Sequence, residues 1–494
     1  MKNTRRSFVY QVMASAAGIA LGNRLIWNIG SPKDSSSHFP GPAGNRDTLS
    51  WWQDAKFGLF IHWGLASKAG GDWKGKETGN IGMMMNEKIP VKEYEAFAAE
   101  FLPDSFNAET WVLAAKQAGM KYIIYVAKHH DGFAMYGSKA SPFNIVDHTA
   151  WKRDPLKEIA IACRKHDIRL GIYYSLGRDW HDPNVPTKKG GWRSNTWDYP
   201  DEKNKKLEVY LANKAIPQVK ELLTDYGPVF SLWFDTPEMV TPEQSKILFD
   251  MVRSLQPDCI INDRVGNGLA DYKTVEQKLS NQVMNVPWEA CMTMNARSWG
   301  YNRHDTNWKS PKALVSNLID IVSKGGNLLL NVGPTGRGEF QQAELERLQE
   351  IGNWLKVNGE SVYSAQRTPF GIEFEKSVAS STRGDELNLP EEIKVMDKSL
   401  DEHTRNAQGG WAWRCTKKNG KLYFHLFQWP EGKFVLPVDC PVINKAYLLG
   451  DSSGKKLTVR ADGNSKTIVL PSKAPDSLVP VLCCEIDENK KPNQ

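Results

Sequence analysis

The carboxylates that follow apolar, strand-like runs are the residues of this sequence best suited to chemistry. Asp235 ends the run 229–234, so its side chain is expected at the end of a strand, beside an aromatic residue. A carboxylate in such a place can act as a nucleophile, a general base or a metal ligand. The segment 236–238 (Thr-Pro-Glu) also has the pattern of a helix start, so helix capping by Asp235 is an equally good interpretation.

Cleavage of a glycosidic bond would need a second carboxyl group as proton donor. Glu276 and Glu289 both follow the segment 262–264 (Asn-Asp-Arg), and either can reach the same strand ends from a long loop. Trp288 would raise the pKa of the Glu289 carboxyl by desolvation if it packs there, as a general acid requires. For each glutamate taken alone, a surface salt bridge is the simpler interpretation.

Histidines and an arginine stand at other expected strand ends. His62 and the adjacent pair His129 and His130 follow apolar runs, and Arg264 follows a third. Neighbouring residues at a strand end point in different directions, and no further His or Cys cluster has the spacing of metal ligands. We therefore predict no metal site, and expect these side chains to form a ring of hydrogen-bond donors suited to sugar hydroxyls. A structural role in the core would explain any one of the histidines alone.

Alternating strand and helix patterns between Trp51 and Tyr363 must position these residues. Such alternation over roughly 300 residues predicts a parallel sheet and suits a (β/α)8 barrel, in which the chemistry collects at the C-terminal ends of the strands. We therefore assign residues 47–365 to an α/β catalytic domain with a (β/α)8-like barrel. The expected strands are 57–62, 122–127, 170–174, 229–234, 260–262 and 327–331, and the expected helices include 108–118, 156–166, 205–223 and 241–254.

The pattern changes after residue 365, and we expect residues 366–490 to form a C-terminal antiparallel β-sandwich. Short strand-like runs there are separated by Gly, Pro, Asn and Asp, a spacing typical of such sandwiches. The runs are 422–429, 433–436, 445–449, 456–460, 467–470 and 479–486.

The first thirty residues have the features of a targeting segment. Arg5 and Arg6 precede an uncharged apolar run at 10–21, which is the pattern of a bacterial twin-arginine signal. The run is shorter than the roughly 20 residues that span a bilayer, so stable membrane insertion is not expected. We predict a signal peptide at 1–30, a Ser-, Pro- and Gly-rich linker at 31–46, and an exported protein, periplasmic or secreted.

The composition excludes several classes of protein. The chain has 494 residues, 40% hydrophobic and 24% charged, which argues against global disorder. A net charge of +6 without a dense basic run argues against a dedicated nucleic-acid binder. The seven Cys lack metal-ligand spacing, and the glycine-rich segments 325–327 and 333–338 match no nucleotide-binding fingerprint, so no cofactor is predicted.

Taken together, these motifs resemble those of the α-L-fucosidases of glycoside hydrolase family 29. The matches keep the order of that family from Trp51 to Tyr363, which makes the set far more specific than any single motif. The matching segments are 56–64 (KFGLFIHWG), 127–133 (AKHHDGF), 173–175 (YYS), 232–235 (LWFD), 262–264 (NDR), 288–289 (WE), 298–301 (SWGY) and 325–334 (GGNLLLNVGP).

The resemblance implies an exo-acting, retaining α-L-fucosidase that removes terminal fucose from oligosaccharides or polysaccharides, without a metal or an organic cofactor. Asp235 would attack the anomeric carbon and form a covalent glycosyl-enzyme. Glu276, in preference to Glu289, would protonate the leaving oxygen and then activate water. By the same resemblance, the fucose hydroxyls would be held by His62, His129, His130, Tyr174, Trp233 and Arg264, with Trp63 against the apolar face and methyl group of the sugar.

One departure from the family pattern follows the expected nucleophile, because members often have glycine where this chain has Thr236. Two other functions stay open at this point. A related retaining glycosidase could act on another sugar, such as an α-L-galactoside, which carries a hydroxyl on the methyl carbon of fucose. A non-catalytic sugar-binding protein is the other, although the presence of Asp235, Glu276 and Glu289 argues against it.

Overall fold

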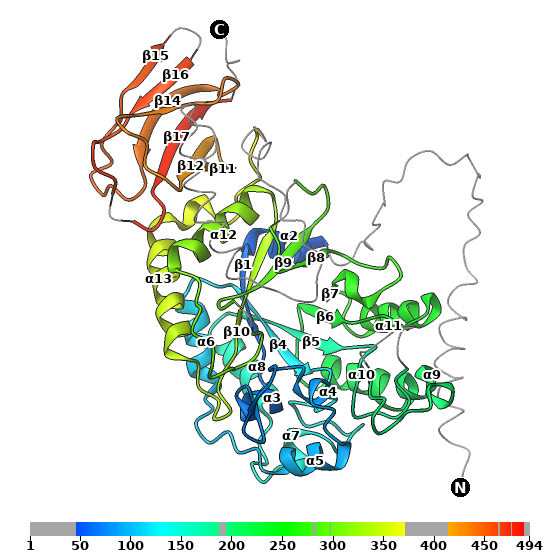
Figure 1. The fold of residues 1–494 in the computed structure, drawn as a ribbon. Helices are drawn as coiled ribbons and strands as arrows, with labels where there is room; N and C mark the ends of the chain where they lie inside the picture. The colour runs from blue at the N-terminus through cyan, green and yellow to red at the C-terminus, as the bar shows by residue number, and fades with distance from the viewer. Residues whose placement is uncertain are drawn as a thin grey trace, which may run out of the picture.

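Eight parallel strands form one curled sheet at the centre of the molecule (Figure 1). The computed structural model describes residues 46–488, apart from 187–193, 280–282, 297, 371–412, 463–464 and 476. The strand order is β7-β6-β5-β4-β1-β10-β9-β8, with helices around the outside, so the predicted (β/α)8-like barrel is confirmed. The barrel strands are β1 (Phe57–Ile61), β4 (Tyr122–Lys128), β5 (Arg169–Ser175), β6 (Ser231–Asp235), β7 (Ile260–Ile261), β8 (Lys273–Glu276), β9 (Trp288–Thr293) and β10 (Asn327–Val332).

The helices lie around this sheet, and side-chain caps fix where several of them begin. Asn107, Asp154 and Thr241 accept hydrogen bonds from backbone N–H groups in the first turns of α6, α8 and α11. The helices are α2 (Arg46–Ala55), α3 (Leu65–Ala69), α4 (Met83–Asn86), α5 (Val91–Ala99), α6 (Ala108–Gln117), α7 (Ile145–His148), α8 (Pro155–Lys165), α9 (Leu207–Tyr210), α10 (Ile216–Thr224), α11 (Pro242–Leu255), α12 (Pro311–Ser323) and α13 (Gln342–Asn358).

Most barrel strands are buried on both faces, which is why they read as nearly continuous apolar runs. Every residue of β4 is buried. Side chains that point into the barrel form one cluster, which includes Phe60, Tyr173 and Trp233. Side chains on the other face, such as Tyr174, belong to a larger cluster that also includes residues of the surrounding helices. Successive side chains of a strand therefore point alternately into the barrel and toward the surrounding helices.

The ring closes between β7 and β8, where the regular ladder is reduced to a bridge between Asn262 and Tyr272. Side chains support this seam: the backbone N–H and the hydroxyl of Thr274 donate to Asp263, and the N–H of Ile261 donates to Asp271. The seam lies on the C-terminal side of β7, beside the residues that follow this strand.

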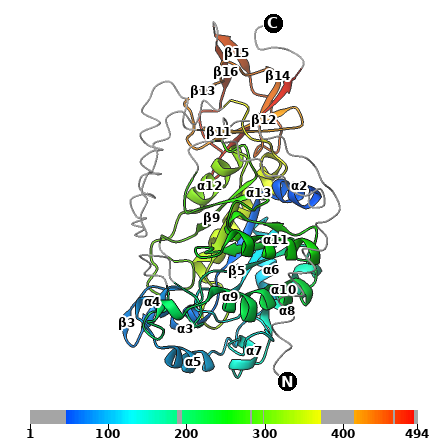
Figure 2. The same cartoon turned by 90° about the vertical axis from the view of Figure 1, so that its right-hand side faces the viewer.

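Two antiparallel sheets after the barrel form the C-terminal β-domain, as predicted, and they share one hydrophobic core. The β-domain packs on the barrel through Trp354 of α13, whose indole N–H donates to the Val479 carbonyl at 2.8 Å. In both views the β-domain lies at one end of the molecule, and α3, α5 and α7 lie at the other (Figures 1 and 2). One sheet contains β11 (Trp413–Lys418), β12 (Lys421–Leu426), β14 (Val442–Leu448) and β17 (Val481–Asp487), and the other contains β13 (Lys433–Val435), β15 (Val459–Asp462) and β16 (Ser465–Val469).

The expected signal peptide at 1–30 and the linker up to residue 45 lie outside the described residues. Within the described ranges, no helix combines the length and the apolar character needed to cross a membrane. One sequence expectation needs correction, because the segments of Glu276 and Glu289 were expected to be loop. They form β8 and β9, which pair with each other in parallel. A short hairpin of β2 (Asp72–Trp73) and β3 (Lys76–Glu77) also follows α3.

Candidate active site

A pocket of about 320 Å³ opens at the C-terminal ends of the barrel strands. Its walls come from the ends of β1, β4, β5, β6, β8 and β9 and from the segments that follow them, as expected for a (β/α)8 barrel. The lining residues are Phe60, His62, Ile81, His129, His130, Tyr173, Trp233, Asp235, Arg264, Glu276, Cys291 and Trp299.

Asp235, the last residue of β6, lies in this pocket with three hydrogen-bond donors around its carboxylate. The Tyr173 hydroxyl donates to Oδ2 at 2.7 Å, and the guanidinium of Arg264 donates to Oδ1 at 2.8 Å. The backbone N–H of Thr236 also donates to Oδ1, at 2.9 Å. The alternative role as a helix cap does not apply, because the next helix, α11, is capped by Thr241.

These donors keep Asp235 ionised. Burial alone would raise the pKa of the carboxyl, but the charge of Arg264 and the hydrogen bonds from Arg264 and Tyr173 outweigh burial and hold the pKa below its ordinary value. The group is therefore available as a carboxylate, the form that can act as a nucleophile.

Arg264 joins Asp235 to a second carboxylate. One terminal nitrogen of its guanidinium donates to Asp235, and the other donates to Glu276 Oε2 at 2.7 Å. Glu276 ends β8 and is more open to solvent than Asp235, with 42% of its side chain exposed against 13%. One carboxyl group in this pair is thus buried and held by three donors, and the other lies at the accessible edge of the pocket.

The three predicted histidines also line the pocket, and burial lowers the pKa of each, so all are neutral near pH 7. The pKa of His62 falls to about 4, although its hydrogen bond to Asn331, 2.6 Å long, and the charge of Asp235 oppose the change. The ring of His129 stacks on Tyr173 with 5.5 Å between centroids. Its buried Nδ1 has no hydrogen-bond partner among the described residues.

His130 is held in one orientation by Ser175. Its Nδ1 lies 2.7 Å from the Ser175 hydroxyl, which itself donates to the Arg178 carbonyl. Because that hydroxyl proton is already used, Nδ1 of the neutral ring carries its proton and donates to Ser175. Nε2 is then an acceptor, 3.9 Å from Asp235 Oδ2.

The residue after Asp235 has a strained backbone. Thr236 has φ 54°, in the left-handed region where a β-branched residue is a clear outlier. Its N–H donates to Asp235, and its carbonyl accepts from the Gly177 N–H at 2.9 Å. The left-handed turn thus lies directly beside the Asp235 carboxylate. It also explains why glycine suits this position.

The structure brings Tyr173 to the pocket in place of Tyr174. Successive side chains of a strand point to opposite faces, so only one of the two tyrosines can face the barrel interior. Tyr173 does so and binds Asp235, whereas the Tyr174 hydroxyl donates to Gln218 of α10, outside the barrel, at 2.8 Å. Tyr173, Phe60 and Trp299 are pocket residues that the sequence analysis did not single out. For Tyr173, the only signal in the sequence was the segment 173–175 (YYS).

Trp63 and Glu289 do not line the pocket that contains Asp235. Trp63 points to the outer face of the sheet, where its ring stacks on Phe106 with 5.1 Å between centroids. Glu289 is the second residue of β9 and points into the barrel at the opposite, N-terminal end of the strands. There its carboxyl accepts from Tyr122 at 2.6 Å and from the indole N–H of Trp233 at 3.2 Å.

Glu289 is 1% exposed, and burial raises the pKa of its carboxyl to about 7, against the hydrogen bonds from Tyr122 and Trp233. The raised pKa matches the expectation, but its cause is burial in the barrel interior. Trp288 points the other way, and its indole N–H faces the Lys324 carbonyl. In the part of the chain that the structure describes, no three His, Cys, Asp or Glu side chains are grouped to hold a metal ion.

The comparisons with known proteins identify the family of this chain. The family model for α-L-fucosidase matches residues 40–360. Plasma α-L-fucosidase of Homo sapiens is 32% identical over an alignment of 340 residues, which covers 64% of this chain and 70% of that protein. The chain therefore belongs to the α-L-fucosidase family, glycoside hydrolase family 29, and is a glycoside hydrolase.

Solved structures give the same result. The crystal structure of α-L-fucosidase from Vibrio sp. strain EJY3 is similar with a TM-score of 0.77 and 31% identity, over 90% of this chain and 74% of that one. α-L-Fucosidase AlfC from Lactobacillus casei, solved with its α-L-fucose product, is 37% identical with a TM-score of 0.61, over 64% of this chain and 100% of that one.

Proposed function

We propose that the protein is an exo-acting, retaining α-L-fucosidase in which Asp235 is the nucleophile and Glu276 is the acid/base. The observation that carries this proposal is the double hydrogen bond of Arg264 to both carboxylates in one pocket. A guanidinium shared in this way is compatible with the roughly 5–5.5 Å between carboxyl groups that a retaining mechanism requires.

In the first step, the ionised Asp235 attacks the anomeric carbon while Glu276 gives a proton to the leaving oxygen. The C–O bond to the aglycone breaks, and an ester between fucose and Asp235 forms. In the second step, Glu276 takes a proton from water, which attacks the same carbon and releases Asp235. Two displacements on opposite faces retain the configuration. The greater exposure of Glu276 suits a group that must meet both the aglycone and water.

We propose Glu276 over Glu289 because of position. Glu276 ends its strand at the mouth of the pocket, whereas Glu289 lies near the start of its strand, on the far side of Trp233. A carboxyl group must come within hydrogen-bond reach of the oxygen that it protonates. Glu289 is separated from the pocket by the Trp233 ring that its own hydrogen bond holds.

The sugar is proposed to be terminal α-L-fucose on an oligosaccharide or polysaccharide. The pocket is limited in size and lined by neutral histidines and aromatic rings, which suits one sugar ring with hydroxyl and C–H faces. A point mutant of the AlfC enzyme has been solved with Fucα(1,6)GlcNAc, so we propose a fucosylated oligosaccharide of this kind as the first substrate to test. We also propose that the twin-arginine segment exports the protein. Replacing Arg5 and Arg6 by lysine should then retain it in the cytoplasm.

The test is hydrolysis of 4-nitrophenyl α-L-fucoside by the purified protein, beside the matching α-L-galactoside. Activity on the fucoside, retained configuration in the first-formed product and loss of several orders of magnitude in Asp235→Asn are the expected results. Azide should restore turnover to Glu276→Ala on the activated aryl substrate, because azide needs no proton transfer. Preference for the galactoside would contradict fucose as the substrate sugar. Azide rescue of Glu289→Ala alone would reverse the acid/base assignment.

A further inference from the structure

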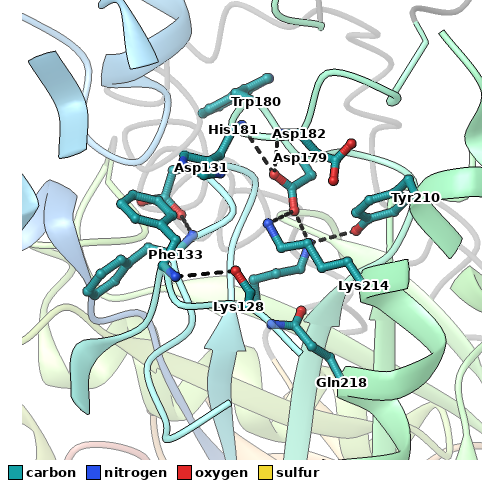
Figure 3. A network of polar contacts seen from close by, with 12 residues as sticks. Lys128, Asp131, Phe133, Asp179, Trp180, His181, Asp182, Tyr210, Lys214 and Gln218 are labelled. Atoms are coloured by element: carbon teal, nitrogen blue, oxygen red, sulfur yellow. Dashed lines mark hydrogen bonds and ion pairs between the residues drawn. The ribbon is translucent and has the colours of Figure 1, made fainter. Parts of the chain in front are cut away.

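One buried carboxylate, in the segment that follows β5, is held between two buried lysines (Figure 3). Asp179 Oδ2 lies 3.1 Å from Lys128 Nζ and 2.8 Å from Lys214 Nζ. The side chains of Asp179 and Lys128 are fully buried, and that of Lys214 is 7% exposed. We call these three residues the lysine clamp. None of them lines the pocket that contains Asp235.

The two lysines reach Asp179 from different elements. Lys128 is the last residue of β4, and its ammonium also donates to the Tyr210 hydroxyl at 2.8 Å. Lys214 belongs to a π-helical turn at Leu211–Ala215, between α9 and α10. Such turns are rare and frequently occur at functional sites. Here the turn contains the second cation of the clamp.

The clamp is electrostatically costly. Burial lowers the pKa of Lys128 to about 8 against the attraction of Asp179, while the two lysines hold the pKa of Asp179 below its usual range despite burial. Buried ion pairs often contribute less to stability than well-packed apolar groups of the same size would. A role in fixing geometry accounts for the clamp better than a role in stability.

The other side of the Asp179 carboxylate fixes two loops that lead to the pocket. Oδ1 accepts hydrogen bonds at 3.1 Å from the backbone N–H groups of His181 and Asp182, which follow β5. Gly132, in the loop after β4, lies against the same oxygen with φ 78°, and a Cβ there would come within 2.1 Å of it. The clamp is therefore the surface on which the loop after β4 packs.

The two loops are also joined by their backbones next to the clamp. The Trp180 N–H donates to the His130 carbonyl at 2.7 Å, and the His130 ring contacts Ser175 and faces Asp235 as described above. Lys128 directly precedes His129 in the chain. A shift at Asp179 would thus be transmitted within one or two residues to His129 and His130, two of the three histidines of the pocket.

We infer that the lysine clamp is a positioning device that holds His129 and His130 at the distance from Asp235 that sugar binding requires. The inference rests on the proposed function, because it concerns the same pocket. It makes Asp179, Lys128 and Lys214 positioning residues, since they act only through the histidines.

The structure offers a matched control for the test. Asp320 of α12 is also a buried aspartate between two cations, 2.5 Å from Lys324 and 2.7 Å from Arg414, but it lies beside the β-domain. Asp179→Asn and Asp320→Asn therefore remove the same charge from similar surroundings. Asp179 lies next to the loop after β4 that contains His129 and His130, and Asp320 lies away from it. Both should lower the melting temperature.

The two variants should differ in kinetics. A misplacement of about 1 Å can cost on the order of 10²-fold in rate, so we expect Asp179→Asn to lose about 10²-fold in kcat/KM on 4-nitrophenyl α-L-fucoside and to bind L-fucose more weakly. Asp320→Asn should stay within about threefold of the wild type. Folded Asp179→Asn with the kinetics of Asp320→Asn would overturn the inference. An inactive wild type would instead contradict the proposed function.

Lys214 provides a second pair of variants in case Asp179→Asn does not fold. Lys214→Met keeps most of the side-chain volume and removes the charge, whereas Lys214→Arg keeps the charge. We expect the methionine variant to lose kcat/KM as Asp179→Asn does and the arginine variant to retain most of it. An equal loss of kcat/KM in both variants would show that packing, and not the charge of Lys214, matters, and it would overturn the inference.

Discussion

Replacing Glu289 by glutamine should make the stability of the protein less dependent on pH while leaving the enzyme active. The carboxyl group titrates near pH 4.5 in an unfolded chain and near pH 7 when buried in the barrel. Between these two values the folded protein keeps a proton that the unfolded chain has released. The stabilisation is therefore fully present below about pH 4.5 and is lost as the pH rises through about 7.

The magnitude follows from the width of this interval. At about 1.4 kcal/mol per pH unit, the interval from pH 4.5 to pH 7 corresponds to roughly 3 kcal/mol of folding free energy. Glutamine is neutral at every pH and has nearly the same shape. Its amide oxygen can accept from the Trp233 indole, and its amino group can donate to the Tyr122 hydroxyl.

The assay is scanning calorimetry of the wild type and Glu289→Gln from pH 4 to 8. The variant should gain stability relative to the wild type as the pH rises, by roughly 3 kcal/mol in total, while kcat/KM stays within about tenfold. A difference in stability that does not change with pH would refute the buried titration. If Glu289→Gln lost turnover as completely as Glu276→Gln, the conclusion that Glu289 takes no part in the reaction would be refuted.

Two further predictions concern the residues around Asp235. Arg264→Lys leaves one ammonium where two guanidinium nitrogens bound two carboxylates, so kcat/KM should fall by about 10²-fold or more. The pKa of Asp235 should also rise, which moves the acidic limb of the pH–rate profile to higher pH; an unmoved limb would contradict the role of Arg264. Thr236→Gly should raise the stability of the barrel by about 1 kcal/mol, because glycine adopts φ 54° without strain. The same change at Thr241, a helix cap with φ −76°, should not stabilise, and equal effects at both positions would rule out strain as the cause.

The barrel and several pocket residues were predictable because their signals are local. Asp235, His62 and Arg264 each follow a run of strand-forming residues, and in a parallel barrel the ends of such runs meet at one edge. Runs of this kind predict where a strand ends without knowledge of the rest of the chain.

Facing direction was not predictable in the same way. Strands buried on both faces carry apolar residues at every position, so the sequence around Tyr173 and Tyr174 does not indicate which of them points inward. Trp63 directly follows His62, and its side chain points to the outer face of the sheet whereas that of His62 points into the pocket; the sequence does not indicate this difference either. Strands β8 and β9 were not predicted because neither has the composition typical of a buried strand. Half of the residues of β8 are charged, and β9 contains only one β-branched residue, Thr293.

The position of Glu289 depends on contacts that are distant in sequence. Its partners Tyr122 and Trp233 come from β4 and β6, and only the closed barrel brings the three together. A Trp-Glu pair in the sequence therefore suggested an acid next to its neighbour Trp288, while the folded chain separates the two onto opposite faces of β9.

The seam of the barrel has a mechanical consequence. Where β7 meets β8 the backbone ladder nearly ends, and the ion pair of Arg264 with Glu276 crosses this junction. Arg264 follows the first strand and Glu276 ends the second, so their contact acts as a latch on the side of the barrel with the fewest backbone hydrogen bonds. In the proposed mechanism, the cleavage chemistry and the closure of the barrel therefore use the same side chains. Amide hydrogen exchange should be fastest along this junction, and faster still when the latch is removed.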